Sequence, residues 1–97
     1  MIDVLSVFAI MDREMARRGF ALEDDHYAPE HFGHRSHSYR RNHASAMALI
    51  WDARDEWFIL RGANPWRDLA TYREARTSNE APEIVVAALL KDLEAAI

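Results

Sequence analysis

The chain has 97 residues, of which 49% are hydrophobic and 29% charged, a length and composition that predict one compact domain over residues 1–97 and exclude a disordered chain. It contains no cysteine, which excludes disulfides and thiolate metal sites and is typical of a cytoplasmic protein. A formal net charge of −4 argues against a general affinity for nucleic-acid phosphates, and no apolar run approaches the roughly 18 residues of a membrane span.

The charges are unevenly distributed along the chain. Residues 35–76 hold eight of the twelve basic side chains and five of the sixteen acidic ones, so the centre is basic and both ends are acidic. This distribution predicts ion pairs between segments that are distant in sequence, an interpretation that we favour over a functional patch of arginines.

A helix is predicted from Met1 to Arg18, because apolar residues recur there at three- and four-residue steps and so share one helical face. These residues are Val4, Val7, Phe8, Met11 and Met15. The end of the helix is marked by Gly19, which can adopt a left-handed conformation, and by Phe20, which can fold back onto the last turn.

The segment from Ala21 to Gly33 shows no sustained period and contains a proline, a glycine and an acidic cluster, so it is predicted to be a loop. In residues 34–44, two serines and Arg40 alternate with His37, Tyr39 and Arg41. This alternation predicts a polar strand at the edge of a sheet.

The longest apolar stretch, Ala44 to Gly62, is predicted to form a β-hairpin over residues 44–61 with a two-residue loop at Ala53 and Arg54. In this register Ile50 would pair with Trp57 and Ala48 with Ile59. One face would carry Met47, Leu49, Trp51, Phe58 and Leu60, and the other Ala46, Ala48, Ile50, Trp57 and Ile59. The alternative is a single helix from Ser45 to Arg61, whose apolar residues would lie all around the cylinder.

Two helices are predicted after the hairpin. Asn64 and Pro65 suit a helix start, which places a short helix from Pro65 to about Ala75, although the alternation in residues 69–73 also suits a strand. Residues 77–79 provide a turn and cap before a helix from Pro82 to Ala96. The apolar stripe of that helix consists of Val86, Leu89, Leu90, Leu93 and Ile97. The predicted fold class is therefore α+β: an N-terminal helix, a small antiparallel sheet centred on the 44–61 hairpin, and two C-terminal helices.

Three of the five histidines, His31, His34 and His37, recur at three-residue steps in the His-rich segment 26–37, and neighbouring carboxylates could add oxygen ligands to a metal site. Against this hypothesis, Gly33 interrupts any helix that would align the rings, and a strand would send His34 and His37 to opposite sides. We favour solvated loop histidines, and predict neither a metal nor a cofactor.

An enzymatic function is not predicted. Serines and histidines are neighbours in residues 34–45, but a catalytic pair is defined by spatial geometry rather than by adjacency in sequence. Three scattered glycines also exclude a glycine-rich phosphate loop.

A further alternative is a binding site for single-stranded nucleic acid, in which aromatic side chains stack on bases and arginines hold phosphates. The candidate residues are Arg35, Arg40, Arg41, Arg54, Arg61 and Arg67, with Tyr39, Trp51, Trp57 and Trp66. The net negative charge favours aromatic side chains in the core and arginines paired with acidic residues.

The functional hypothesis follows from the two apolar faces of the hairpin. Three helices of this length could cover one face of a narrow sheet, and the other face would remain as an apolar surface. We therefore predict a non-enzymatic protein-binding module, either a homodimer or a small inhibitor or adaptor on a larger partner. The predicted interface consists of Ile50, Trp57, Ile59, Arg54 and Arg61, because arginine and tryptophan are enriched at interfaces. Phage-encoded blockers of bacterial defence complexes are similar in size and charge alone.

Overall fold

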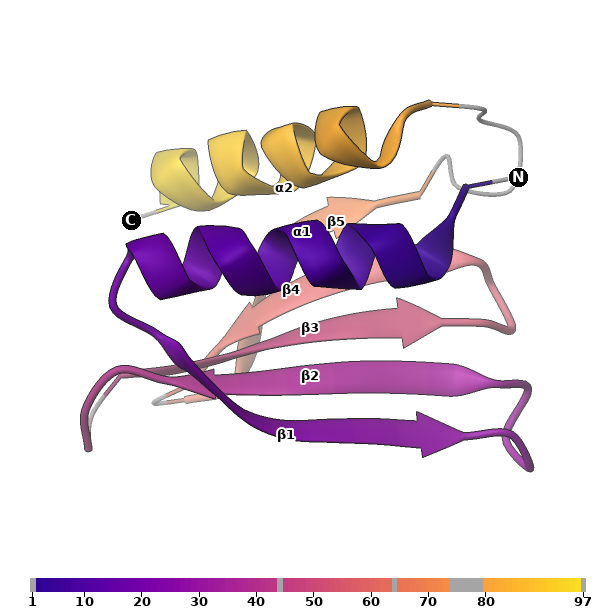
Figure 1. The fold of residues 1–97 in the computed structure, drawn as a ribbon, viewed down its shortest axis with the longest axis horizontal. Coiled ribbons are helices and arrows are strands. Elements are labelled where there is room, and N and C mark those ends of the chain that lie inside the picture. The colour runs from indigo at the N-terminus through magenta and orange to yellow at the C-terminus, as the bar shows by residue number, and fades with distance from the viewer. Residues whose placement is uncertain (1, 44, 64, 74–79, 97) are drawn as a thin grey trace.

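The computed structural model describes residues 2–43, 45–63, 65–73 and 80–96, which form two helices and five strands (Figure 1). In chain order the elements are α1 (Val4–Arg17), β1 (Ala21–Ala28), β2 (His34–Arg40), β3 (Ala46–Asp52), β4 (Trp57–Gly62), β5 (Arg67–Tyr72) and α2 (Pro82–Ala96). The fold is α+β, as predicted, but one helix follows the sheet instead of two.

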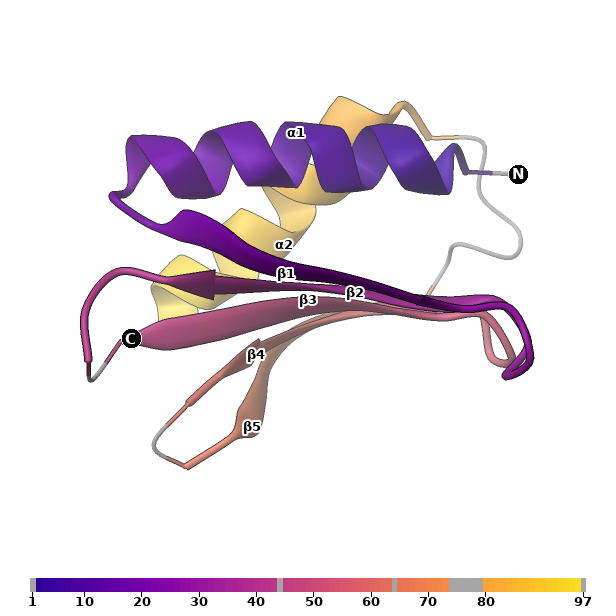
Figure 2. The same ribbon diagram turned by 60° about the horizontal axis from the view of Figure 1, so that its bottom comes forward.

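The sheet is an antiparallel meander in the order β1-β2-β3-β4-β5. Both helices lie on one side of it, and no other described element covers the opposite side (Figure 2). We call the side under the helices the inner face and the opposite side the outer face. Figure 1 shows that α1 and α2 run in the same direction, so their carboxyl ends lie at the same end of the molecule.

The predicted N-terminal helix is confirmed, but α1 begins at Val4 rather than at Met1, and local chemistry sets its boundaries. The Asp3 carboxylate caps the first turn, where it accepts hydrogen bonds from the backbone N–H and the hydroxyl of Ser6 at 3.1 and 2.7 Å. These bonds, the hydroxyl first, lower the pKa of Asp3. At the other end Gly19 has φ of +84°, and the N–H of Phe20 donates to the carbonyl of Met15, which is the predicted Schellman ending.

The central stretch forms the predicted hairpin and not a helix, but with a different register. Ile50 pairs with Ile59 rather than with Trp57, because the turn contains four residues, 53–56. The Asp52 carboxylate accepts hydrogen bonds from two N–H groups of this turn, and Glu56 has a positive φ of 58°. A shift of two residues preserves the side on which each side chain lies, so the two predicted faces are retained.

The segment from Ala21 to Ala28 is a strand, and the prediction of a loop there was wrong. As a result β2, which was expected at an edge, is an inner neighbour of the edge strand β1. Strand β1 forms without an apolar pattern because its backbone pairs with β2 from Ala21 to Ala28. Two ion pairs across these strands, Asp25–Arg35 and Glu23–Arg40, both at 2.9 Å, add a small contribution. These pairs join the acidic N-terminal part to the basic centre, but they connect neighbouring strands rather than the segments distant in sequence that the charge distribution predicts.

The predicted helix over 65–75 was also wrong in its described part, because Arg67–Tyr72 forms β5. Ala70 pairs with Leu60 and Tyr72 with Phe58, so the strand adds two more residues to the inner face. Pairing with a complete neighbouring strand outweighs a local helix-start pattern. Asn64 of that pattern, and the turn predicted at 77–79, lie outside the described residues.

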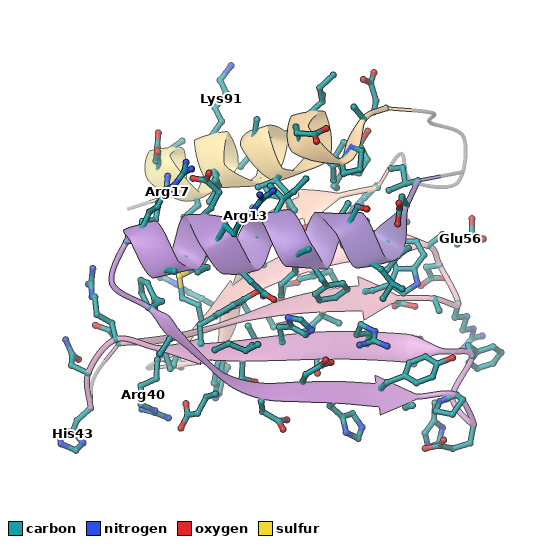
Figure 3. The ribbon with its side chains drawn as sticks, viewed as in Figure 1. Arg13, Arg17, Arg40, His43, Glu56 and Lys91 are labelled. Carbon is teal, nitrogen blue, oxygen red and sulfur yellow. The ribbon has the colours of Figure 1, made fainter. Side chains whose placement is uncertain are left out.

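The core lies between the helices and the inner face. Helix α2 contributes the predicted stripe Val86, Leu89, Leu90 and Leu93, all buried, whereas Ile97 lies outside the described residues. Val85 of α2 is also fully buried, although the predicted stripe did not include it. Further large buried side chains come from α1 and from the central strands: Val7, Phe8, Met11, Met15, Tyr39, Leu49, Trp51, Phe58 and Leu60. Lys91 projects away from the sheet (Figure 3). No helix in the described ranges is long and apolar enough to cross a membrane.

Candidate functional site

The outer face is built from alternate residues of every strand. Two cross-strand rows define its centre: His26, Ser36, Ile50, Ile59 and Thr71 form one row, and Asp24, Ser38, Ala48, Arg61 and Asp68 form the next. The face therefore changes from polar on β1 and β2 to apolar on β3 and β4, and becomes polar again on β5.

The apolar centre of the outer face is shallow rather than protruding. Ile59 is only 8% exposed and Ala48 9%, although no helix covers them, because cross-strand neighbours lie about 5 Å apart and shield one another. Beside them is a hollow of about 330 Å³, lined by residues that include Ile50, Ile59, Ser36 and Arg61. Trp57 is half-buried, and the Arg73 guanidinium stacks 4.3 Å from its ring centre.

Charges of both signs surround this centre. Arg61 binds Asp68 at 2.6 Å on the β4–β5 side. Glu23 binds Arg40 at the β1–β2 edge. The paired groups leave no large field of a single sign on the face, which suits contact with a protein surface better than attraction of a polyanion.

The structure brings four of the five predicted interface residues together. Ile50, Trp57, Ile59 and Arg61 share the outer face, on the adjacent strands β3 and β4. Arg54 lies apart from them in the turn between these strands, where its guanidinium is 5.9 Å from the centre of the Phe32 ring.

The three histidines of the alternative metal site are dispersed. His34 accepts a hydrogen bond from the backbone N–H of Ala53, His37 is buried on the inner face, and His31 lies in the turn between β1 and β2. Among the described residues, no group of three His, Asp or Glu side chains is arranged to hold a metal ion. The expectation that a strand would separate His34 from His37 agrees with this placement.

The residues of the alternative nucleic-acid site do not share one surface either. Tyr39 and Trp51 belong to the core, whereas Trp57 lies on the outer face and Trp66 is exposed at the β4–β5 connection. Several of the candidate arginines are held by carboxylates: Arg35 by Asp25, Arg40 by Glu23 and Arg61 by Asp68.

Sequence reasoning missed a buried polar cluster under α1. One Asp12 carboxylate oxygen accepts a 2.6 Å hydrogen bond from the Tyr39 hydroxyl and lies 2.8 Å from Nδ1 of His37. The Nε2 atom of His37 is 3.1 Å from Asp25, but this contact lacks hydrogen-bond alignment, so we interpret it as electrostatic. The His37 ring also packs against Phe8, with centroids 4.5 Å apart.

This cluster connects α1 to the sheet, because Asp12 of the helix contacts His37 and Tyr39 of β2. Burial, followed by the hydrogen bond to Asp12, raises the pKa of Tyr39 well above its usual range, so its hydroxyl stays protonated and donates. The nearby serines Ser36 and Ser38 point to the outer face, away from His37, and so cannot act with it as nucleophiles. A signal was present in the sequence: Asp12 is a charge at the helical spacing of Phe8 and Met15, on the apolar stripe of α1.

Comparisons with known protein families, with curated proteins and with solved structures yield no match.

Proposed function

We propose that this chain is a non-enzymatic protein-binding module that works in the cytoplasm and docks through the outer face of its sheet. The supporting observation is that both helices lie on the inner face, while the outer face carries Ile50, Trp57 and Ile59 beside a hollow. An uncovered face with an apolar centre and a polar rim has the general composition of a protein interface.

The occupant that the charge pattern favours is a second copy of the chain. In a two-fold dimer the same surface of each copy meets the other. A surface with charges of one sign would repel its copy, whereas a surface with both signs can place opposite charges against each other. The ion pairs Arg61–Asp68 and Glu23–Arg40 supply both signs around the apolar centre.

The size of the face limits the strength of such a dimer. Strands spaced about 4.8 Å apart, with a rise of about 3.4 Å per residue, give a five-stranded face roughly 24 by 20 Å, or about 500 Å² on each copy. Two such faces would bury about 1,000 Å² in total, below the roughly 1,200–2,000 Å² of stable specific interfaces and in the range of weak, transient ones. We therefore expect a reversible dimer with a dissociation constant in the micromolar range, on the order of 1–100 μM.

Sedimentation velocity across the range from about 1 μM to 1 mM tests this proposal, because it spans the expected dissociation constant. Wild-type protein should change from monomer to dimer over this range. Trp57→Glu should remain monomeric, because it places a charge in the apolar contact. Trp66→Glu is the matched control at an exposed tryptophan in the β4–β5 connection, outside the paired strands.

A monomer at every concentration would exclude the homodimer and leave the inhibitor or adaptor form, in which the same face docks on a larger partner. That form is tested by capture from the native host with wild-type, Trp57→Glu and Trp66→Glu proteins. Partners retained equally by all three proteins would show that the outer face is not the binding surface.

A further inference from the structure

A second concave site lies at the end of the molecule where both helices finish. It has a volume of about 310 Å³, at the lower end of the roughly 300–1,000 Å³ of small-molecule pockets. Its lining residues come from the carboxyl ends of the helices and from the β2–β3 and β4–β5 ends of the sheet. These ends of the elements meet at the left in Figure 1. We call it the end pocket, and it is separate from the outer face proposed above for protein binding.

The floor of the end pocket is apolar. Phe20, Met47 and Leu93 are each less than 10% exposed, and they come from the α1–β1 connection, β3 and α2 respectively. Gly62 allows Leu69 to complete this floor, because a Cβ atom at residue 62 would lie 2.7 Å from a methyl group of Leu69. An aliphatic group inside the pocket would thus be surrounded by carbon.

Three arginines form the rim of the pocket. Arg18 is already engaged by Glu14 at 3.1 Å and by Glu94 at 3.4 Å. The Arg41 guanidinium lies 4.9 Å from the centre of the Phe20 ring, and Arg67 is exposed at the start of β5.

Arg41 and Arg67 differ from most of the other arginines. Within the part of the chain that the structure describes, five arginines form ion pairs with carboxylates, whereas Arg41 and Arg67 do not, and neither do Arg13, Arg54 and Arg73. What distinguishes Arg41 and Arg67 is their position, because both line the same pocket with an apolar floor.

We propose that the end pocket binds an aliphatic carboxylate, with the hydrocarbon on the apolar floor and the carboxylate between Arg41 and Arg67. The guanidinium group matches a carboxylate through parallel N–H···O bonds. Glu94 and the carboxyl ends of the two helices repel anions, and they repel a doubly charged phosphate more than a singly charged carboxylate. The two arginines therefore favour the singly charged group. The same chemistry occurs in a free acyl chain and in a peptide that ends in an aliphatic residue.

Isothermal titration calorimetry at pH 7 with the full chain separates these sources. The probes are decanoate below its micelle concentration, the uncharged decanol, and an acetylated peptide ending in Leu-Leu with either a free carboxylate or an amide. One-to-one binding of decanoate, at least tenfold tighter than decanol, identifies an acyl carboxylate. Binding of the free peptide, at least tenfold tighter than the amide, identifies a chain terminus.

Variants locate the site. Arg41→Gln combined with Arg67→Gln should weaken binding at least tenfold, while Arg13→Gln combined with Arg54→Gln makes the same charge change elsewhere and should leave binding within twofold. Ala63→Leu, which fills the pocket without a change of charge, should also weaken binding at least tenfold. Circular dichroism verifies that each variant is folded.

Three outcomes would overturn the proposal: no binding of either carboxylate by millimolar concentration, equal binding of charged and uncharged probes, or equal losses in the two arginine pairs. In NMR spectra the Met47 methyl group and the Leu93 amide should shift on binding. Shifts confined to Ile50 and Ile59 would place the ligand on the outer face and would likewise overturn it. None of these results depends on whether the chain dimerises.

Discussion

The buried polar cluster under α1 depends on Asp12, because its carboxylate contacts both the Tyr39 hydroxyl and the His37 ring. Asp12→Ala leaves both groups buried without their partner, at a cost of about 1–3 kcal/mol for each unsatisfied group. Tyr39→Phe removes one donor and leaves Asp12 with His37, so it should cost only about 1 kcal/mol. Urea unfolding would measure both changes, and equal losses in the two variants would contradict this assignment.

The buried Tyr39 hydroxyl should also make the folded protein less stable at alkaline pH. Its pKa is raised by burial and by Asp12 in the folded protein, whereas in the unfolded chain it ionises near pH 10. The contribution of Tyr39 to stability is therefore complete below about pH 10 and is lost as the pH rises further. In an absorbance titration at 295 nm, one tyrosine should ionise only together with unfolding, and this step should be absent from Tyr39→Phe. A Tyr39 signal that titrates near pH 10 in folded protein would disprove the prediction.

The sequence did not predict this cluster, and distance along the chain explains why. Residues 34–44 were predicted as a polar edge strand, and the histidines as solvated, yet His37 is only 6% exposed. Its partners Asp12 and Asp25 come from α1 and β1, which no local pattern connects with β2. The outer-face residues Ile50, Trp57 and Ile59 could be grouped in advance, since alternation within one hairpin decides which side chains share a face.

At the scale of elements, the ending of α1 requires Gly19, whose φ of +84° is costly for a residue with a side chain. Gly19→Ala should lower the free energy of unfolding by about 1 kcal/mol. Gly19→Asn should lower it less, because asparagine tolerates the left-handed conformation. Thermal or urea unfolding would give the order, and an alanine variant as stable as wild type would show that the ending relaxes without cost.

The elements with a clear apolar period were predictable, and those without one were not. Helices α1 and α2 follow their apolar stripes, and β3 and β4 follow the central apolar stretch. Strand β1 has exposed side chains at every residue except Ala28, so its sequence contains no burial pattern, and its structure depends on β2. Strand β5 begins after a helix-start pattern, and only its pairing with β4 identifies it as a strand.

At the scale of the molecule, the replacement of a predicted helix by β5 changes the balance of layers. It widens the sheet to five strands and reduces the helical layer to two helices, both on the inner face. Three helices were predicted to leave one face of a narrow sheet uncovered. With two helices and a wider sheet, the uncovered area is larger than that prediction implied. The same arrangement leaves β1 as an edge strand whose outward N–H and C=O groups have no strand partner in the described fold.

A dimer could form through the outer face or through the β1 edge, and amide hydrogen exchange distinguishes these two contacts. Amides of β3, which pair on both sides, should exchange only through global unfolding, whereas every second amide of β1 should exchange orders of magnitude faster. A dimer through the outer face buries side chains and leaves the β1 edge free, so fast exchange in β1 should persist at concentrations where the protein is dimeric. A dimer through β1 would pair that edge and protect these amides. Protection of β1 that increases with concentration would therefore contradict the proposed outer-face contact even if sedimentation shows a dimer.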